Sequence, residues 1–224
     1  MPSLIPGYEY DIFVSYRHND NKSGWVTDFV EDLKKELAAT IKEPVSIYFD
    51  KNLSDGLQET HHVDKTLDGK LKCLIFIPIV SQTYCDENSY AWRQEFCAFN
   101  KFSAADQFGR DITLSNGNVA SRILPVKIHA LDQDDTKAFE TQTGGILRAA
   151  EFVYREPGIN RPLLPDDDPR QNLNKTRYRN QMNKVANAVK DILTGLRNFG
   201  NPAYDALQEE RSEKGLSFAN VKSI

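Results

Sequence analysis

The residue with the clearest chemical potential is Glu95, a carboxylate among aromatic side chains. Trp92, Phe96 and Phe99 recur at helical spacing, so they share one face of a predicted helix. Glu95 comes three residues after Trp92 and therefore lies at the border of that apolar face rather than opposite it. A carboxylate in this position is partly removed from water, and partly desolvated carboxyl groups are candidates for chemistry.

The helix of Glu95 follows the most apolar run of the chain, Cys73–Val80. An unbroken run rich in isoleucine and bounded by polar residues predicts a strand that is buried on both faces. Pro78 is unusual there, because proline cannot donate a hydrogen bond to the ladder and prefers edges and strand ends. The polar turn Asp86–Ser89 separates this strand from the helix.

Other strands and helices alternate along the chain. Besides Cys73–Val80, we expect strands at Tyr8–Tyr16, Val45–Phe49, Ile123–Ile128 and Glu151–Tyr154. Helical spacing of apolar residues predicts helices at Trp25–Leu37, Thr60–Leu71, Asp134–Thr141 and Tyr178–Leu196. We further expect a small hairpin at Gly109–Val119, because it carries an Asn-Gly pair, and a long loop rich in proline and aspartate at Arg155–Asn172.

This alternation predicts an α/β fold: a flavodoxin-like, doubly wound parallel sheet of about five strands in the order 2-1-3-4-5, with flanking helices. Ligands of such sheets bind at the carboxyl ends of the strands, where the strand order reverses. That rule brings Tyr16, Arg17 and His18, after the first strand, close to Ser81–Glu95, after the third. We expect one domain over residues 1–198, with its core in 8–198, and a loosely ordered tail over 199–224.

Composition excludes several classes of function. With 40% hydrophobic and 27% charged residues in 224, the chain has the make-up of a soluble globular protein. A net charge of −4 attracts neither nucleic acid nor an anionic membrane, and neither a signal peptide nor a run of membrane-spanning length is evident. The three cysteines lack the spacing of a disulfide framework or a zinc site, and the adjacent His61 and His62 are poorly spaced for a metal. We therefore expect a cytoplasmic protein with no metal.

Motifs that are missing narrow the site further. The chain has no GxGxxG, no P-loop and no GxSxG, so the usual phosphate cradles and the nucleophile elbow are absent. A response-regulator receiver would place an acidic pair directly after the first strand, and a flavodoxin would place a phosphate loop there. Ser15, Tyr16 and Arg17 occupy that position instead. One carboxylate edged by aromatic residues remains, with a basic residue across the predicted crevice.

Three segments in this order resemble the Toll/interleukin-1 receptor (TIR) domain family, in particular its bacterial members. They are Asp11–Arg17 (DIFVSYR), then Phe49-Asp50 with Leu53 and Gly56, and then Ser81 and Tyr84 with Trp92–Glu95. The resemblance covers roughly residues 8–198. One departure is that the family usually spaces its tryptophan and catalytic glutamate four residues apart, whereas Phe96 takes that place here and Glu95 comes one residue early.

The resemblance implies an NAD+ glycohydrolase that cleaves the nicotinamide–ribose bond and acts in signalling or antiphage defence. Glu95 would be catalytic, Tyr16, Arg17, His18 and Trp92 would bind the substrate, and no cofactor would be needed. The loop with Asp50, Leu53 and Gly56 would bind another TIR domain, so that self-assembly activates the enzyme. One carboxylate suffices for this reaction, because nicotinamide leaves as a neutral ring without a general acid and only the oxocarbenium-like ribose needs stabilising.

Several alternatives stay open at this point. Glu95 is an ordinary solvated helix residue in one of them, and Arg17 forms a surface ion pair with Asp20 or Asp50 in another. Two other functions also fit: a non-catalytic TIR adaptor, and an N-glycosidic enzyme similar to nucleoside deoxyribosyltransferases, which use a glutamate nucleophile on a similar fold. The glycohydrolase product is either linear or cyclised ADP-ribose.

Overall fold

The computed structural model describes residues 2–50, 69–167 and 176–200 of the 224. Leu53, Gly56, His61, His62, most of the predicted helix Thr60–Leu71 and the tail from residue 201 lie outside the described residues.

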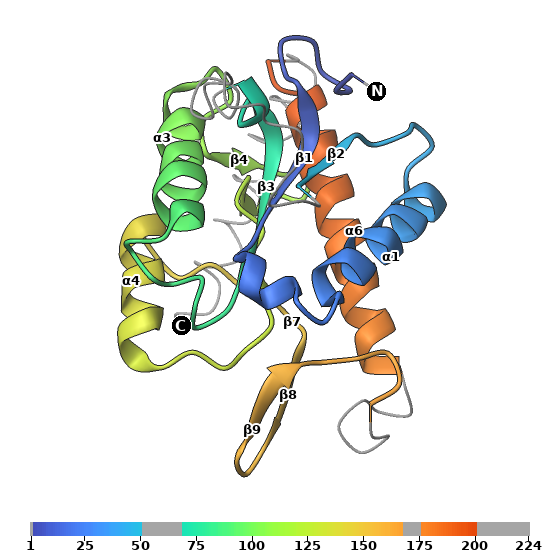
Figure 1. Cartoon of the computed structure of the whole chain (residues 1–224). Coiled ribbons are helices and arrows are strands. Elements are labelled where there is room, and N and C mark those ends of the chain that lie inside the picture. Colours follow the sequence, from blue (N-terminus) through green and yellow to red (C-terminus); the bar gives the residue numbers. More distant parts are fainter. Residues whose placement is uncertain (1, 51–68, 168–175, 201–224) are drawn as a thin grey trace, which may run out of the picture.

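A five-stranded parallel sheet forms the centre of the protein (Figure 1), in the spatial order β2-β1-β3-β6-β7. Its strands are β1 (Tyr10–Ser15), β2 (Ile47–Phe49), β3 (Cys73–Val80), β6 (Val126–Lys127) and β7 (Ala150–Glu151). Counted along the chain, these five strands lie in the order 2-1-3-4-5, which confirms the predicted flavodoxin-like fold.

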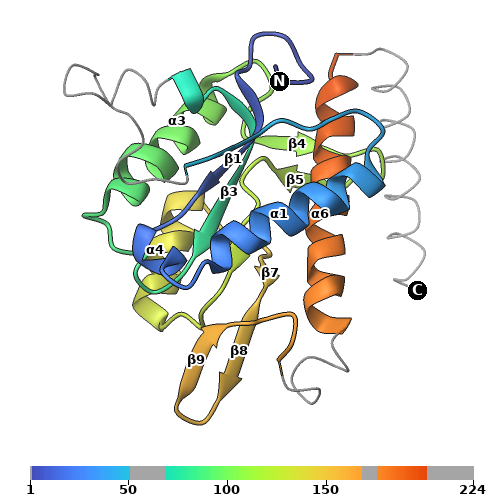
Figure 2. The same ribbon diagram turned by 45° about the vertical axis from the view of Figure 1, so that its right-hand side comes forward.

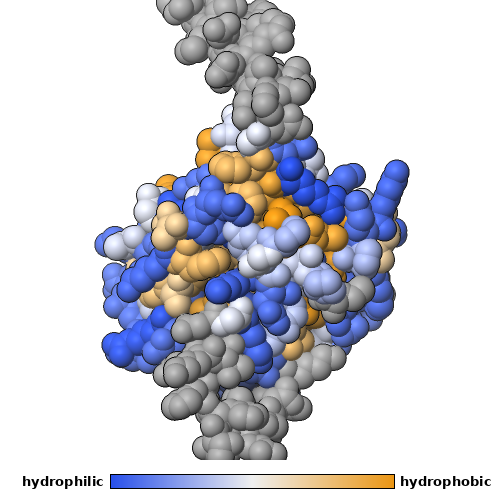
Figure 3. Space-filling model, turned by 90° about the horizontal axis from the view of Figure 1, so that it is seen from above, coloured by the Kyte–Doolittle hydropathy of each residue, from blue (hydrophilic) through white to orange (hydrophobic). Residues whose placement is uncertain are grey.

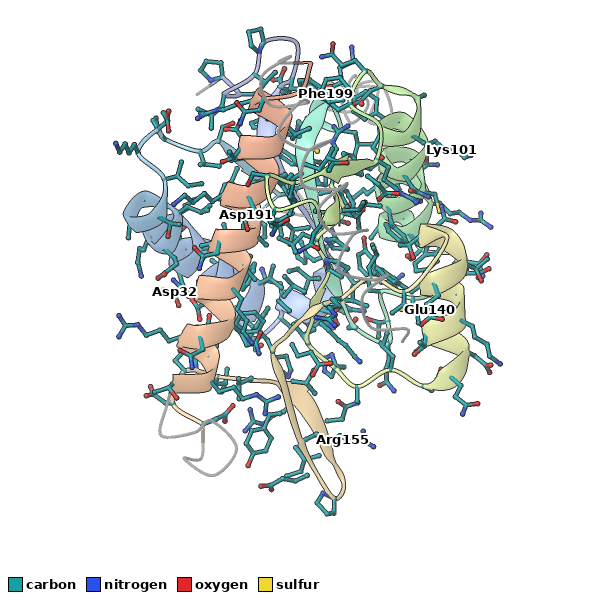
Figure 4. All side chains as sticks on the ribbon, turned by 180° about the vertical axis from the view of Figure 1, so that it is seen from behind. Asp32, Lys101, Glu140, Arg155, Asp191 and Phe199 are labelled. Atoms are coloured by element: carbon teal, nitrogen blue, oxygen red, sulfur yellow. The ribbon has the colours of Figure 1, made fainter. Side chains whose placement is uncertain are left out.

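Helices cover both faces of the sheet (Figures 1 and 2). The helices α1 (Trp25–Thr40) and α6 (Thr176–Arg197) lie on one face. The π-helix η2 (Ala91–Phe96), α3 (Cys97–Ala105) and α4 (Gln133–Thr143) lie on the other. Charged residues such as Asp32, Glu140 and Asp191 lie on these helices (Figure 4). No helix among the described residues is both long and apolar enough to span a bilayer.

Strand β3 contributes side chains to both cores, which explains why its sequence is apolar throughout. Ile75, Ile77 and Ile79 pack in the core on the side of α1 and α6. Phe76 and Val80 pack in the second core, against η2, α3 and α4. Every residue of β3 is buried, as expected for a central parallel strand.

Pro78 lies in this central strand at a place where the ladder is interrupted. The backbone groups of Phe76 and Val80 bond toward the β6 side, because Phe76 N donates to Arg122 O and Ile128 N donates to Val80 O. Alternation puts the nitrogen of Pro78 on the same side. On that side, Phe76 pairs with Ile123 in an isolated bridge, and the first pair of β3 with β6 is Ile79 with Val126. Residue 78 has no ladder partner between them, so the missing N–H of proline breaks no hydrogen bond.

The two excursions from the sheet are both hairpins. The first joins β4 (Asp111–Thr113) to β5 (Val119–Ser121) and confirms the predicted hairpin. The second joins β8 (Val153–Glu156) to β9 (Ile159–Pro162), where we predicted the end of the fifth strand and a long loop. That prediction was wrong, because the fifth strand of the sheet ends at Glu151 and the next residues pair with β9. Pro157-Gly158 makes the turn, with Gly158 at φ 77°, a conformation that glycine adopts freely.

A buried cation ties the amino-terminal end of β3 to its surroundings. Arg122 is 0% exposed, and its guanidinium donates to the carbonyl oxygens of Leu74 (2.8 Å), Cys73 (3.0 Å) and Gly109 (3.0 Å). It also donates to the Asp106 carboxylate at 2.5 Å. The rings of Tyr8, Phe99 and Phe108 surround it, with 5.7–5.9 Å from guanidinium carbon to ring centre. Figure 3 views the molecule from the amino-terminal end of β3, where apolar areas alternate with hydrophilic ones.

Candidate functional site

A hollow of about 440 Å³ lies at the carboxyl ends of β1 and β3, where the strand order reverses. Its lining comes from the segment that follows β1 and from the start of η2: Tyr16, Arg17, His18, Asn19, Tyr90, Ala91 and Glu95. The position is where parallel α/β sheets bind ligands, and the volume is within the range of small-molecule sites. The structure thus brings together Glu95, Tyr16, Arg17 and His18, as the topology predicted.

Glu95 is carried by the π-helix η2 rather than by a regular α-helix. The helix begins after Ser89, whose hydroxyl oxygen accepts a hydrogen bond from Trp92 N at 3.1 Å. Short π-helical segments are rare and occur frequently at functional sites, because the wider turn changes which side chains face the core. Trp92 and Phe96 are buried on η2, while Glu95 between them is half-buried and reaches the end of β1.

A chain of two hydroxyl groups contacts Glu95 from the interior. Ser15 Oγ donates a hydrogen bond to Glu95 Oε2 at 2.5 Å. The Tyr84 hydroxyl lies 2.9 Å from the same Ser15 Oγ. Ser15 is 1% exposed and Tyr84 is 0% exposed, so the contact between them is buried, while the contact of Ser15 with Glu95 is partly buried. The carboxylate is thus held on its inner side and open to the hollow on its outer side.

Burial raises the pKa of Glu95 to about 7, far above the usual carboxyl value. The hydrogen bond from Ser15 opposes this effect because it stabilises the ionised form, and the negative charge of Asp50 adds to it. A cationic group that enters the hollow would favour the ionised form of a carboxyl group whose pKa is raised in this way.

Tyr16 and His18 form one wall of the hollow. Tyr16 is buried, and its hydroxyl donates to the backbone oxygen of Asp50, which ties the end of β1 to the residue after β2. His18 is exposed, and its ring meets the Tyr16 ring edge-on at a centroid distance of 5.3 Å. The imidazole is therefore placed for contact with a ligand.

Arg17 forms an ion pair, but with a different residue from those considered in the sequence. Its Nη1 lies 3.4 Å from Asp86 Oδ2, whereas Asp20 accepts hydrogen bonds from Ser81 and Thr83. Asp86 belongs to the turn before η2, so the pair joins the two sides of the crevice. Both side chains are partly exposed, and an ion pair of this kind contributes little to stability. A ligand phosphate can therefore replace Asp86 at little cost.

Trp92 does not line the hollow, although we predicted it to bind the substrate. The ring is 4% exposed and packs edge-on against Tyr84, Phe96 and Phe139. The physical reason is the apolar face itself: Trp92 continues the stripe of Phe96 and Phe99 into the core. Of the predicted self-association loop, Asp50 is described, while Leu53 and Gly56 lie outside the described residues.

The sequence reasoning did not assign roles to five residues of the site. Asn19, Tyr90 and Ala91 line the hollow, and Ser15 and Tyr84 hold Glu95. The role of Ser15 had a detectable signal, because alternation along β1 puts it on the same face as Phe13, the face that η2 covers. The role of Tyr90 depends on the geometry of the turn before η2, for which periodicity carries no information.

In the part of the chain that the structure describes, no group of three or more His, Cys, Asp or Glu side chains is arranged to hold a metal ion.

Comparison with known proteins gives distant likenesses among solved structures only. No protein-family model matches the sequence, and no curated protein matches it. Among solved structures, the fold is similar to the TIR domains in the activated Roq1 resistosome directly recognizing the pathogen effector XopQ. The two chains are 15% identical, 92% of this chain and 98% of that chain are covered, and the TM-score is 0.37.

Proposed function

We propose that the protein is an NAD+ glycohydrolase in which the ionised Glu95 stabilises positive charge on the ribose as nicotinamide leaves. The observation that supports this most directly is the position of Glu95: a half-buried carboxylate open to a hollow at the order reversal of a parallel sheet. The resemblance of the sequence to TIR domains supplies the substrate class. Purified protein incubated with NAD+ should release nicotinamide, and mass spectrometry then distinguishes linear from cyclised ADP-ribose.

Cleavage of the nicotinamide–ribose bond requires from the protein little more than one fixed negative charge beside the ribose. The pyridinium ring of NAD+ is cationic and becomes neutral nicotinamide as the bond breaks, so the leaving group needs no proton. Glycosidases that expel an alkoxide need a second carboxyl group for that step. The positive charge that moves onto the ribose is then stabilised by Glu95, in a site where water screens the interaction only partly.

Arg17 and His18 bind the substrate in this proposal, through its phosphate or ribose oxygens. They line the hollow next to each other, in the segment that follows β1. Deoxynucleosides offered in place of NAD+ test the deoxyribosyltransferase alternative. Release of free base from them, with none from NAD+, would favour that enzyme.

Replacing Arg17 with alanine is expected to raise the KM for NAD+ more than it lowers kcat. The reason is that a phosphate contact is made equally in the ground state and the transition state, and loss of such uniform binding appears in KM. Steady-state kinetics measure both constants. Asp86→Asn is the matched control, because it removes the partner of Arg17 and leaves the guanidinium in place; its KM should fall or stay unchanged. A large loss of kcat at constant KM in Arg17→Ala would contradict the assignment.

Self-assembly through the loop that follows β2 is part of the proposal and rests on the resemblance. The described residues that line the hollow include no glycine-rich phosphate loop, so they cover only part of a dinucleotide. A head-to-tail contact between neighbouring copies would complete the site and build a filament.

Specific activity is therefore expected to rise steeply with protein concentration or crowding. Measuring nicotinamide release over a wide range of enzyme concentration, with light scattering in parallel, checks this. Gly56→Pro, which alters the loop and leaves Glu95 unchanged, should abolish the rise. Constant specific activity across the range would instead indicate an enzyme that works as a single chain.

A further inference from the structure

We propose that Tyr84 and Ser15 form a one-directional hydrogen-bond relay that keeps Glu95 ionised for the reaction. Both are positioning residues, since they act on Glu95 from the interior and neither lines the hollow. The consequence for catalysis rests on the proposed function, whereas the relay itself is a property of the folded protein.

The direction of the relay follows from counting protons. Ser15 has a single hydroxyl proton, and the carboxylate of Glu95 is an acceptor only, so that proton points to Oε2. The 2.9 Å contact between Ser15 Oγ and the Tyr84 hydroxyl must then have Tyr84 as the donor. Among the residues that the structure describes, the Tyr84 hydroxyl has no other hydrogen-bond partner, and it is 0% exposed. Tyr84 therefore orients Ser15, and Ser15 points at Glu95.

This order favours the ionised form of Glu95 over the neutral form. A protonated Glu95 offers Ser15 only a neutral oxygen, which is a weaker acceptor than a carboxylate. If the relay reversed, so that Glu95 donated to Ser15 and Ser15 to Tyr84, the buried Tyr84 proton would have no acceptor. Burial raises the pKa of Glu95 and the contact from Ser15 lowers it, which agrees with this role.

Other charged and titratable groups act on Glu95 from the surrounding elements. Asp50, after β2, raises the pKa of Glu95 by its negative charge. Arg17 and His18 line the same hollow from the segment after β1, and Arg17 is paired with Asp86.

The pKa values of Tyr16 and Tyr84 are raised mainly by burial, with Glu95 contributing, so both stay neutral near pH 7. Cys97, after η2, also has a raised pKa because of burial. The relay thus supplies the hydrogen bond on the inner side of Glu95.

Two substitutions remove the relay at different points. Ser15→Ala deletes the hydrogen bond to Glu95, and Tyr84→Phe leaves that bond but frees the Ser15 hydroxyl to turn away. The matched controls are Ser103→Ala and Tyr178→Phe. Ser103 is a buried hydroxyl in α3 that donates to Asn100 O, and Tyr178 is a buried tyrosine in α6 near Asp32. Neither control residue contacts Glu95.

The primary measurement is the titration of Glu95 by NMR in protein labelled with carbon-13 at the glutamate side-chain carboxyl. The resonance of Glu95 is identified by its absence from Glu95→Gln, and no substrate is needed. The titration midpoint should rise by about one to two pH units in Ser15→Ala and by about half a unit to one unit in Tyr84→Phe. Both controls should titrate as the parent protein does.

The pH profile of NAD+ cleavage gives a second measurement. The acidic limb of this profile should move to higher pH in Ser15→Ala and Tyr84→Phe by the same amounts as the titration midpoints. Tyr84→Phe should also regain most of its activity at alkaline pH, which simple structural damage would not allow. An unchanged or lowered titration midpoint for Glu95 in folded Tyr84→Phe would overturn the relay. If Ser15→Ala does not fold, the result for Tyr84→Phe decides alone. Raised midpoints in a protein that never cleaves NAD+ would support the relay and refute the glycohydrolase.

Discussion

Replacing Glu95 with glutamine is expected to lower the rate of NAD+ cleavage by about 10²–10³-fold. The side chain keeps its size, and its amide oxygen still accepts the hydrogen bond from Ser15, but the negative charge that faces the ribose is gone. Nicotinamide release at saturating NAD+ measures the loss. Glu87→Gln is a suitable control, because Glu87 lies in the turn before η2 and does not line the hollow. Full activity in Glu95→Gln would refute the assignment of the catalytic residue.

The same variant has a second expected property, which shows whether it folds. The pKa of Glu95 is raised from 4.5 to about 7. The protonated group therefore contributes its full stability at pH values below the pKa of the unfolded chain, and this stability is lost as the pH rises through about 7. Glutamine stays neutral throughout. The free energy of unfolding of Glu95→Gln should therefore equal that of the parent protein near pH 4.5. At pH 8 it should be higher by roughly 1–2 kcal/mol, allowing for the partial exposure of the side chain. Thermal unfolding at the two pH values checks the sign, and lower relative stability at pH 8 would contradict a buried charge.

Replacing Asp106 with alanine is expected to destabilise the protein by about 3–5 kcal/mol, because it leaves the fully buried Arg122 without its counter-ion. The three carbonyl contacts of Arg122 remain, but they carry no full negative charge. Tyr8 also loses the acceptor of its hydroxyl, and Phe108 N loses its contact with Asp106 Oδ1. Urea denaturation measures the change, and the midpoint should fall by about 2 M for an ordinary m value.

A double variant separates the unpaired charge from the lost packing. Asp106→Ala combined with Arg122→Met removes the cation as well, so it should be more stable than Asp106→Ala alone, even though it carries one more substitution. Asp111→Ala is the matched control, since Asp111 pairs with Arg110 in a partly exposed position and should change stability by less than about 1 kcal/mol. A double variant that is less stable than Asp106→Ala would show that packing of Arg122 against its three rings dominates.

Much of the fold follows from two sequence patterns. The apolar run of β3 and the helical stripes of α1 and α6 are long, so their burial decides their structure with little influence from neighbours. Strand order could then be predicted from the alternation of strands and helices, since crossover rules leave few topologies. The position of the hollow could be predicted by the same rule, because the order reversal brings the residues after β1 to the helix of Glu95.

Other features depend on contacts that periodicity does not record. Half of the residues in β8 and β9 are polar and no long apolar pattern runs through them, so only the Pro157-Gly158 turn could indicate this hairpin in the sequence. The ion pair of Arg17 with Asp86 depends on side-chain positions across the crevice. Burial of Arg122 is contrary to its residue type and arises from partners in four separate segments of the chain. Trp92 packs in the core and does not line the hollow, and its place on an apolar face could not distinguish these two positions in advance.

The strand order also constrains how the chain can fold as it leaves the ribosome. Strand β1 is made before β2 and β3 but lies between them, so its apolar residues Ile12–Val14 have partners on both sides only after residues 75–77 have emerged. The core beneath α1 stays open longer, because α6 is the last described helix and packs against α1. Such non-local pairing makes folding slow and exposes apolar segments in the meantime. The nascent chain is therefore a candidate substrate for ribosome-associated chaperones until α6 is released.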